Sequence, residues 1–258
     1  MRFLFFFLFL IPLPAVDVIT PTITVPALAA DHLELATVLK SVVKADGVDY
    51  SELRRDTSAL DRYRVQLARA ATPTNTQEKI AFYINAYNAF TLALVAEQLP
   101  ADASTWNRWS IKDAGGWFTS VWKYYTFELA GTRVTLDHLE HGLLRPLGEP
   151  RIHFAINCAS RSCPSLAATP YLAITLEQQL EAATKAFANN PYHLRLVDGN
   201  IITNPILSWF AVDFAASGGV TKFLASRVTP SPIAHQLATN AKLTYFTYDW
   251  SLNIAATP

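Results

Sequence analysis

The two cysteines of this chain, Cys158 and Cys163, lie five residues apart in the stretch HFAINCASRSCPSL. A cysteine thiolate is both a nucleophile and a redox group, so this stretch is the first place to look for chemistry. Three interpretations are open: a reactive thiol at Cys158, a disulfide, or a pair that cycles between dithiol and disulfide. The spacing differs from the C-x-x-C of thioredoxin-like proteins. Because Cys163 precedes Pro164, we expect it at the N-terminus of a helix, where the pKa of a thiol is lowered.

A thiol nucleophile needs a base within hydrogen-bond reach, and His141 and His153 are the histidines nearest to the cysteines in sequence. The segment 151–157 has the pattern of a central strand, with His153 on it. Its odd separation from Cys158 places the two side chains on opposite faces unless the strand ends before the cysteine. His141 lies on a different predicted element and has no such restriction.

Two amide side chains, Asn85 and Asn88, lie on the most apolar helix that the sequence predicts. This helix covers residues 77–99, with Asn75 as its N-cap and Pro100 after its end. It is apolar on nearly every face, so we expect it to be buried on nearly every face. A buried amide without partners costs roughly 1–3 kcal/mol. The pair therefore predicts either a structural polar network or the lining of a site.

Three further polar residues complete the candidate site: Glu140, Ser160 and Asp249. Glu140 or Asp249, like the two amides, could orient the base or polarise a substrate carbonyl. Glu140 lies between His138 and His141, but two histidines do not make a metal site. The sequence has no glycine-rich phosphate loop and no H-E-x-x-H motif. We therefore expect neither a metal nor a cofactor.

The composition is that of a globular protein with ample material for a core. The 258 residues are 51% hydrophobic, and 21 Lys and Arg balance 21 Asp and Glu. A neutral chain of this kind is a poor candidate for nucleic-acid binding, which depends on excess positive charge. We find no linker and no internal repeat, which predicts a single domain over residues 30–258.

The first 29 residues have the features of a secretory signal peptide. Arg2 precedes the apolar run FLFFFLFLIPLPA, and the small-residue site Ala27-Leu28-Ala29 follows it. We expect cleavage there and export to the periplasm or the outside of the cell. No later run reaches the roughly 18 consecutive apolar residues of a membrane span, so we expect no membrane association after cleavage.

The order of predicted elements favours an α+β fold with helices packed on an antiparallel sheet. Helical patterns come first, and hairpins are predicted around Ala130-Gly131 and around Asp198-Gly199-Asn200. No β-α-β alternation is present, which argues against a parallel sheet.

Five motifs in this order resemble the bacterial and plant family known as domain of unknown function number 547, over about residues 45–253. They are FYINAYNAF, LDHLEHGLLR, RIHFAINCASRSCPSL, SWFAVDF and YDWSLN. The resemblance implies no established activity, but it implies a distant similarity to papain and transglutaminase-like cysteine enzymes and such a core. In the family pattern, His153 and Cys158 match the anchor positions, whereas Cys163 is serine in plant members. The resemblance therefore implies that Cys158 is the better nucleophile candidate, and it argues against an obligatory disulfide across the family.

Two functions follow as hypotheses. In the first, an exported thiol-dependent hydrolase or transferase attacks an amide or ester bond with Cys158, and His141 or His153 accepts its proton. In the second, a non-catalytic binding or scaffold domain retains the fold of a cysteine enzyme. Its aromatic residues, including the tryptophans of residues 106–122, would then line a groove for a small molecule, a peptide or a glycan.

Overall fold

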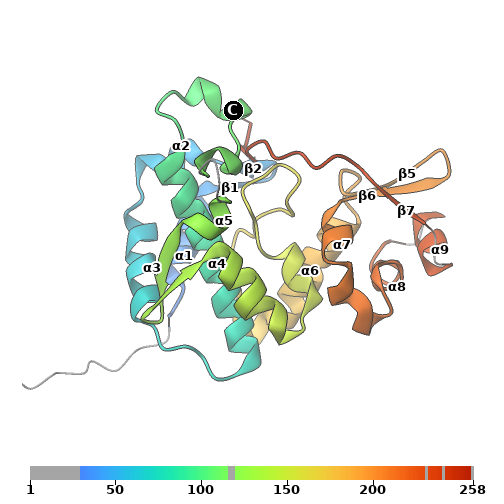
Figure 1. Ribbon diagram of the computed structural model, residues 1–258, viewed down its shortest axis with the longest axis horizontal. Coiled ribbons are helices and arrows are strands. Elements are labelled where there is room, and N and C mark those ends of the chain that lie inside the picture. The colour runs from blue at the N-terminus through green and yellow to red at the C-terminus, as the bar shows by residue number, and fades with distance from the viewer. Residues whose placement is uncertain (1–29, 116–119, 230–231, 240–241, 257–258) are drawn as a thin grey trace, which may run out of the picture.

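The computed structural model describes residues 30–115, 120–229, 232–239 and 242–256 (Figure 1). The predicted signal peptide and Trp117 lie outside the described residues. Four helices open the described chain: α1 Leu33–Val42, α2 Tyr50–Arg55, α3 Ser58–Arg69 and α4 Thr76–Gln98. The short strands β1 Val43–Lys44 and β2 Gly47–Val48 form a hairpin between α1 and α2.

Helix α4 is the centre of the larger hydrophobic core. The Asn75 side chain caps it by accepting hydrogen bonds from the backbone N–H groups of Gln77 and Glu78, as predicted. Every residue from Ile80 to Val95 is buried. By length and hydropathy this helix could cross a membrane, but 94% of the relevant window is buried inside the protein. Such burial is what the core helix of a globular domain shows.

Within the described residues, the strands form three small sheets. β3 Thr126–Leu129 pairs with β4 Thr132–Thr135, and β5 Leu194–Val197 pairs with β6 Asn200–Thr203, both antiparallel. These are the two predicted hairpins, and with the helices they confirm the α+β class. β7 Leu243–Tyr245 adds to β6 in the parallel direction. The helices therefore pack mainly on one another rather than on one large antiparallel sheet.

The remaining helical elements are short, except for α6. They are α5 Val121–Tyr124, α6 Leu176–Ala188, α7 Ile206–Trp209, α8 Val220–Ala225 and α9 Pro232–Ala238, the π-helix η3 His138–Leu144, and the 3-10 helices η1 Ala103–Arg108, η2 Ile111–Ala114, η4 Arg145–Leu147, η5 Pro150–Phe154, η6 Ala173–Thr175 and η7 Ala211–Ser217.

The prediction of a strand over residues 151–157 is wrong. Pro150 opens the 3-10 helix η5, and the Glu149 side chain caps it. A proline fixes a helical φ and cannot donate a hydrogen bond to a strand partner, so the chain turns here. The backbone after η5 bonds to a side chain instead of to a neighbouring strand, since the Asn157 N–H donates to the Asn88 side chain at 2.9 Å.

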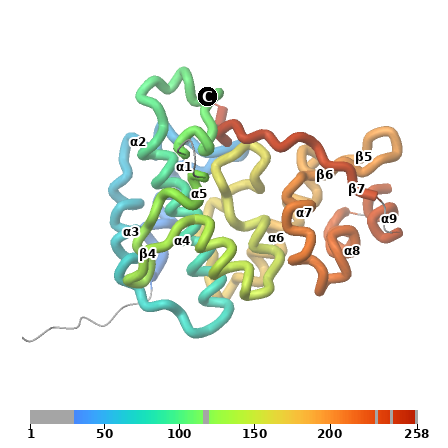
Figure 2. The backbone as a smooth tube through the Cα atoms, viewed as in Figure 1, coloured from blue at the N-terminus to red at the C-terminus, as the bar shows by residue number. Residues whose placement is uncertain are grey.

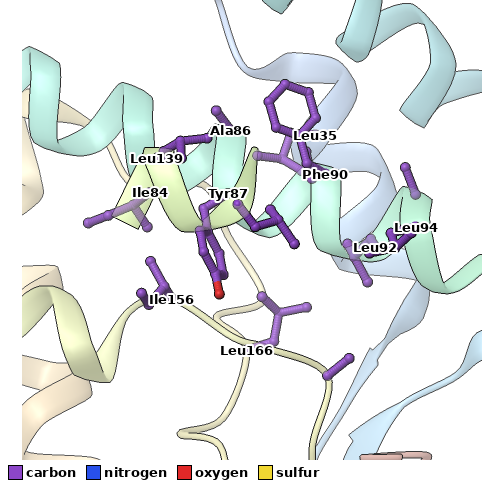
Figure 3. Packing of buried hydrophobic residues seen from close by; sticks show 14 of the residues in the cluster. Leu35, Ile84, Ala86, Tyr87, Phe90, Leu92, Leu94, Leu139, Ile156 and Leu166 are labelled. Carbon is purple, nitrogen blue, oxygen red and sulfur yellow. The ribbon is translucent and has the colours of Figure 1, made fainter. Parts of the chain in front are cut away.

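Two groups of elements lie on opposite sides of α6 (Figures 1 and 2). Helices α1–α4 form one group, and α7–α9 with β5–β7 form the other, each with its own buried cluster. The chain after β7 returns across the molecule to the first group, where Ile254 pairs with Val48. Figure 3 shows Tyr87 pointing from α4 toward the segment that carries Ile156 and Leu166. The segment with both cysteines thus lies between α4 and the returning C-terminal chain.

Candidate active site

A pocket of about 220 Å³ opens beside residues 155–166, the cysteine segment. It draws its walls from residues far apart in sequence: α4, α5, η3, the cysteine segment, α7 and the C-terminal chain. The described residues that line it are Tyr87, Ser120, Trp122, Asp137, Glu140, His141, His153, Ile156, Cys158, Cys163, Pro164, Ile206, Trp209, Phe210, Tyr248 and Trp250. It therefore contains Cys158, both candidate bases and Glu140.

Cys158 and Cys163 form a disulfide bond in this structure. Cys158 is partly exposed in the pocket, whereas Cys163 is buried. Two donors reach the Cys163 sulfur: the Cys158 backbone N–H at 3.0 Å and the Tyr248 hydroxyl at 3.3 Å. The Cys158 sulfur lies 3.1 Å from the Ser160 hydroxyl and 3.5 Å from that of Tyr248. No helix begins at Pro164, so the predicted helix N-terminus at Cys163 is wrong.

Buried side chains fix the backbone on both sides of Cys158. Asn88 donates to the Ala155 carbonyl at 3.0 Å and accepts from the Asn157 N–H at 2.9 Å. Asn157 accepts from the Ala159 N–H and donates to the Pro164 carbonyl. Ala159 has a φ of +62°, a left-handed conformation that an L-residue with a Cβ rarely adopts. Such conformations persist where the surroundings impose them, and they are concentrated at functional sites.

His153 is buried and is paired with the partly buried Asp213. Its Nε2 lies 2.7 Å from the Asp213 carboxylate, which also accepts two hydrogen bonds from Arg145 at 2.7 and 2.8 Å. Because Arg145 and His153 lower the pKa of Asp213, the carboxylate is ionised and the proton of the neutral imidazole lies on Nε2. The buried Nδ1 atom has no hydrogen-bond partner, including either sulfur. Phe210 stacks on the ring with centroids 3.9 Å apart.

Burial controls the charge of His153. It lowers the pKa to about 4, and the contact with Asp213 offsets only part of that effect. At neutral pH His153 is therefore an uncharged imidazole whose Nδ1 lone pair is buried and has no hydrogen-bond partner. An uncharged imidazole can accept a proton, and its pKa of about 4 makes it a weak base.

Glu140 is the second titratable group of the pocket. The π-helix η3 carries it, and such irregular turns occur frequently at functional sites. Its removal from water raises the pKa to about 7, although Arg145 opposes the shift, and it is hydrogen-bonded to Tyr87. A carboxyl group that is half-protonated near neutral pH can act as a general acid or base.

Three other predicted site residues are His141, Ser160 and Asp249. His141 is exposed, hydrogen-bonds Arg145 through Nδ1 at 3.1 Å, and has a pKa lowered by its partial burial. Ser160 is buried beside Tyr248, with hydroxyl oxygens 2.8 Å apart. Asp249 accepts hydrogen bonds from the Ser251 N–H and hydroxyl and so holds the C-terminal turn.

Asn85 does not line the pocket. It donates to the Tyr171 carbonyl at 2.8 Å and accepts from the Tyr171 N–H at 2.9 Å, which fastens α4 to a loop. Asn88 fastens α4 to the cysteine segment in the same way, and it thereby fixes the backbone next to Cys158. Among the tryptophans, Trp106 and Trp109 are buried in the core, and Trp122 lines the pocket.

Several site residues were missed in the sequence. Asp213 and Arg145 lie within the motifs SWFAVDF and LDHLEHGLLR, whose polar residues were the available signal. Tyr248 and Trp209 look like ordinary core aromatics in sequence. Across the described parts of the chain, no group of three His, Cys, Asp or Glu side chains is placed to hold a metal ion.

One comparison with known proteins gives a match. Residues 71–188 match the family model described as "Protein of unknown function, DUF547". Residues 71–188 belong to the DUF547 family. The expected family is thereby confirmed, over a shorter stretch than residues 45–253. No curated protein matches the chain, and no solved structure does. The similarity to papain-like enzymes stays a prediction.

The DUF547 region includes Cys158, His153 and Glu140. Asp213, Tyr248 and the exposed Trp209 lie after it in sequence. The part of the chain after residue 188 therefore completes the pocket that the DUF547 region begins.

Proposed function

We propose that this pocket is the active site of a thiol-dependent hydrolase or transferase that acts on an amide or ester carbonyl. One observation carries the proposal: Cys158, His153 with its unpartnered Nδ1, and the half-ionised Glu140 line the same small pocket. A nucleophile, a neutral base oriented by a carboxylate and a proton donor are the groups that acyl transfer requires.

The disulfide is the resting form in this proposal. A dithiol reductant attacks the accessible Cys158 sulfur and expels the Cys163 thiolate, to which the Cys158 N–H and the Tyr248 hydroxyl donate. The second thiol of the reductant then releases Cys158, so that the reductant leaves as a disulfide and the protein carries two thiols. Reduction frees the Cys158 side chain to rotate toward His153.

The proposed acyl-transfer step uses these three groups of the pocket. The Cys158 thiol gives its proton to His153 Nδ1, and the sulfur attacks the carbonyl carbon. The bond to the leaving group breaks as that group takes a proton from Glu140, which leaves a thioester on Cys158. Water or another acceptor then gives its proton to Glu140 and attacks the thioester, and His153 returns its proton to the sulfur.

A burst experiment tests this function. After reduction with dithiothreitol, p-nitrophenyl acetate should release one equivalent of p-nitrophenolate per protein in a rapid first phase. Cys163→Ser should show the burst without reductant, because no disulfide can form, and Cys158→Ser should show none. A reduced, folded protein without a burst above the Cys158→Ser control would refute the proposal.

The non-catalytic binding domain is the second candidate, and the disulfide favours it, because neither sulfur is a free thiol in this structure. It predicts that Cys158→Ser leaves ligand binding intact. The disulfide also supports the proposal of export through a signal peptide over residues 1–29, since disulfides persist in oxidising compartments.

A further inference from the structure

The residues that line the pocket also indicate which class of ligand it could bind. Six aromatic side chains line it, and two carboxyl groups, Asp137 and Glu140, are the acidic ones. The aromatic residues are Tyr87, Trp122, Trp209, Phe210, Tyr248 and Trp250. Of the described lining residues, none is Lys or Arg. We propose that the pocket binds an organic ammonium group, held by aromatic faces and by the Glu140 carboxylate.

Aromatic rings attract cations through the negative potential of their faces. Trp209, Tyr248 and Trp250 form one cluster, with ring centroids 4.5 to 5.8 Å apart, and Trp122 meets Trp250 edge-on at 5.6 Å. Two of the wall rings already accept a cation from the protein itself. Lys112 Nζ lies 4.5 Å from the centre of the Trp250 ring, and the Arg145 guanidinium lies 5.2 Å from that of Phe210.

Other rings are available to a ligand. Across the described chain no cationic side chain lies over Trp122, Trp209 or Tyr248. Trp209 is 49% exposed although it is a large apolar side chain, so its ring forms an open rim of the pocket. An exposed tryptophan beside a pocket is a surface on which a ligand can pack.

The charges select a cation rather than an anion or a neutral group. Glu140 has no ion-pair partner among the described residues. Arg145, whose positive charge lowers the pKa of Glu140, is already paired with Asp213. Asp137 has only loose contacts at 3.8 Å with Lys123 and His141. A bound ammonium group would give Glu140 the partner it lacks, whereas a carboxylate or phosphate would meet two carboxyl groups.

The size of the pocket limits the ligand. A volume of about 220 Å³ is below the roughly 300–1,000 Å³ of sites that enclose drug-sized ligands. It therefore fits one head group or one side chain. As a statement about the substrate, this inference rests on the proposed function; as a statement about a ligand, it rests on the walls alone.

Choline and 3,3-dimethyl-1-butanol test the inference, because they have the same shape and differ in the positive charge. Calorimetric titration of the wild-type protein in its disulfide form should show choline binding at least about tenfold tighter than the neutral isostere, given the strength of desolvated cation–π contacts. Equal affinities, or no saturable choline binding in the millimolar range, would overturn the inference.

Two variants locate the site. Trp209→Leu and Glu140→Gln should each weaken choline binding several-fold, whereas Tyr124→Leu, which changes an exposed aromatic outside the pocket, should not. Choline affinity that stays unchanged in both pocket variants would contradict the proposed site. Since the titration needs no free thiol, choline binding without a burst in the p-nitrophenyl acetate assay would refute the enzyme and leave this inference standing.

Discussion

Replacing Asn88 by alanine tests how the cysteine segment is held. The change removes two buried hydrogen bonds and leaves the Ala155 carbonyl and the Asn157 N–H without the amide that pairs them. Each unpaired buried backbone group costs about 1–3 kcal/mol, so Asn88→Ala, which leaves two of them, should lower the free energy of unfolding by about 2–6 kcal/mol. For a protein of this size, that corresponds to a fall in Tm of roughly 4–24 °C.

Asn85→Ala is the matched control for this experiment. Asn85 lies one helical turn earlier on α4 and also makes two buried hydrogen bonds, but to Tyr171 instead of the cysteine segment. Urea denaturation should give similar losses of stability for the two variants. Only Asn88→Ala should change the rate at which dithiothreitol reduces the disulfide, because only Asn88 fixes the backbone beside Cys158. Equal reduction rates in both variants, or a stability loss below about 1 kcal/mol for Asn88→Ala, would refute this reasoning.

Three further predictions concern stability. The pKa of His153 is lowered to about 4 in the folded protein, so the unfolded state binds this proton first as the pH falls from 6.5. Between pH 6.5 and 4 the wild-type protein should therefore lose up to about 3 kcal/mol of its free energy of unfolding relative to a His153→Gln variant. Parallel curves of unfolding free energy against pH for the two proteins would contradict this. Asp213→Asn should cost about 1–3 kcal/mol in urea denaturation, because Arg145 loses a charged acceptor, and an unchanged midpoint would argue against the pair. Gly47→Ala should lower the Tm by several degrees, because a Cβ there would lie 2.5 Å from the Asn253 carbonyl oxygen, and a wild-type Tm would show that the contact relaxes freely.

Local patterns predicted the elements that depend on local chemistry. The long apolar helix, its Asn75 cap and both hairpins follow from periodicity and turn residues, and the structure has them. The segment 151–157 failed because its alternating apolar residues resemble a strand, whereas Pro150 and the Asn88 side chain decide its conformation. A hydrogen bond from a helix 67 residues away leaves no trace in a short window of sequence.

The candidate site could be predicted only in part, because only some of its residues stand out in local motifs. Cys158, His153 and Glu140 are of types and in motifs that indicate chemistry, and the structure brings them to one pocket. Asp213 comes from an element 60 residues after His153, and no spacing rule connects the two. Tyr248 reaches the pocket because the chain after β7 returns across the molecule, whereas Trp209 reaches it from α7.

The alkylation rate of Cys158 tests most directly whether this pocket activates a thiol. In a Cys163→Ser protein at pH 6, iodoacetamide should label Cys158 at least about tenfold faster than glutathione, of which only about 0.3% is thiolate if its pKa is about 8.5. Adding His153→Gln should remove most of that advantage. A folded protein that reacts no faster than glutathione, or that reacts equally fast without His153, would contradict a catalytic thiol at this site.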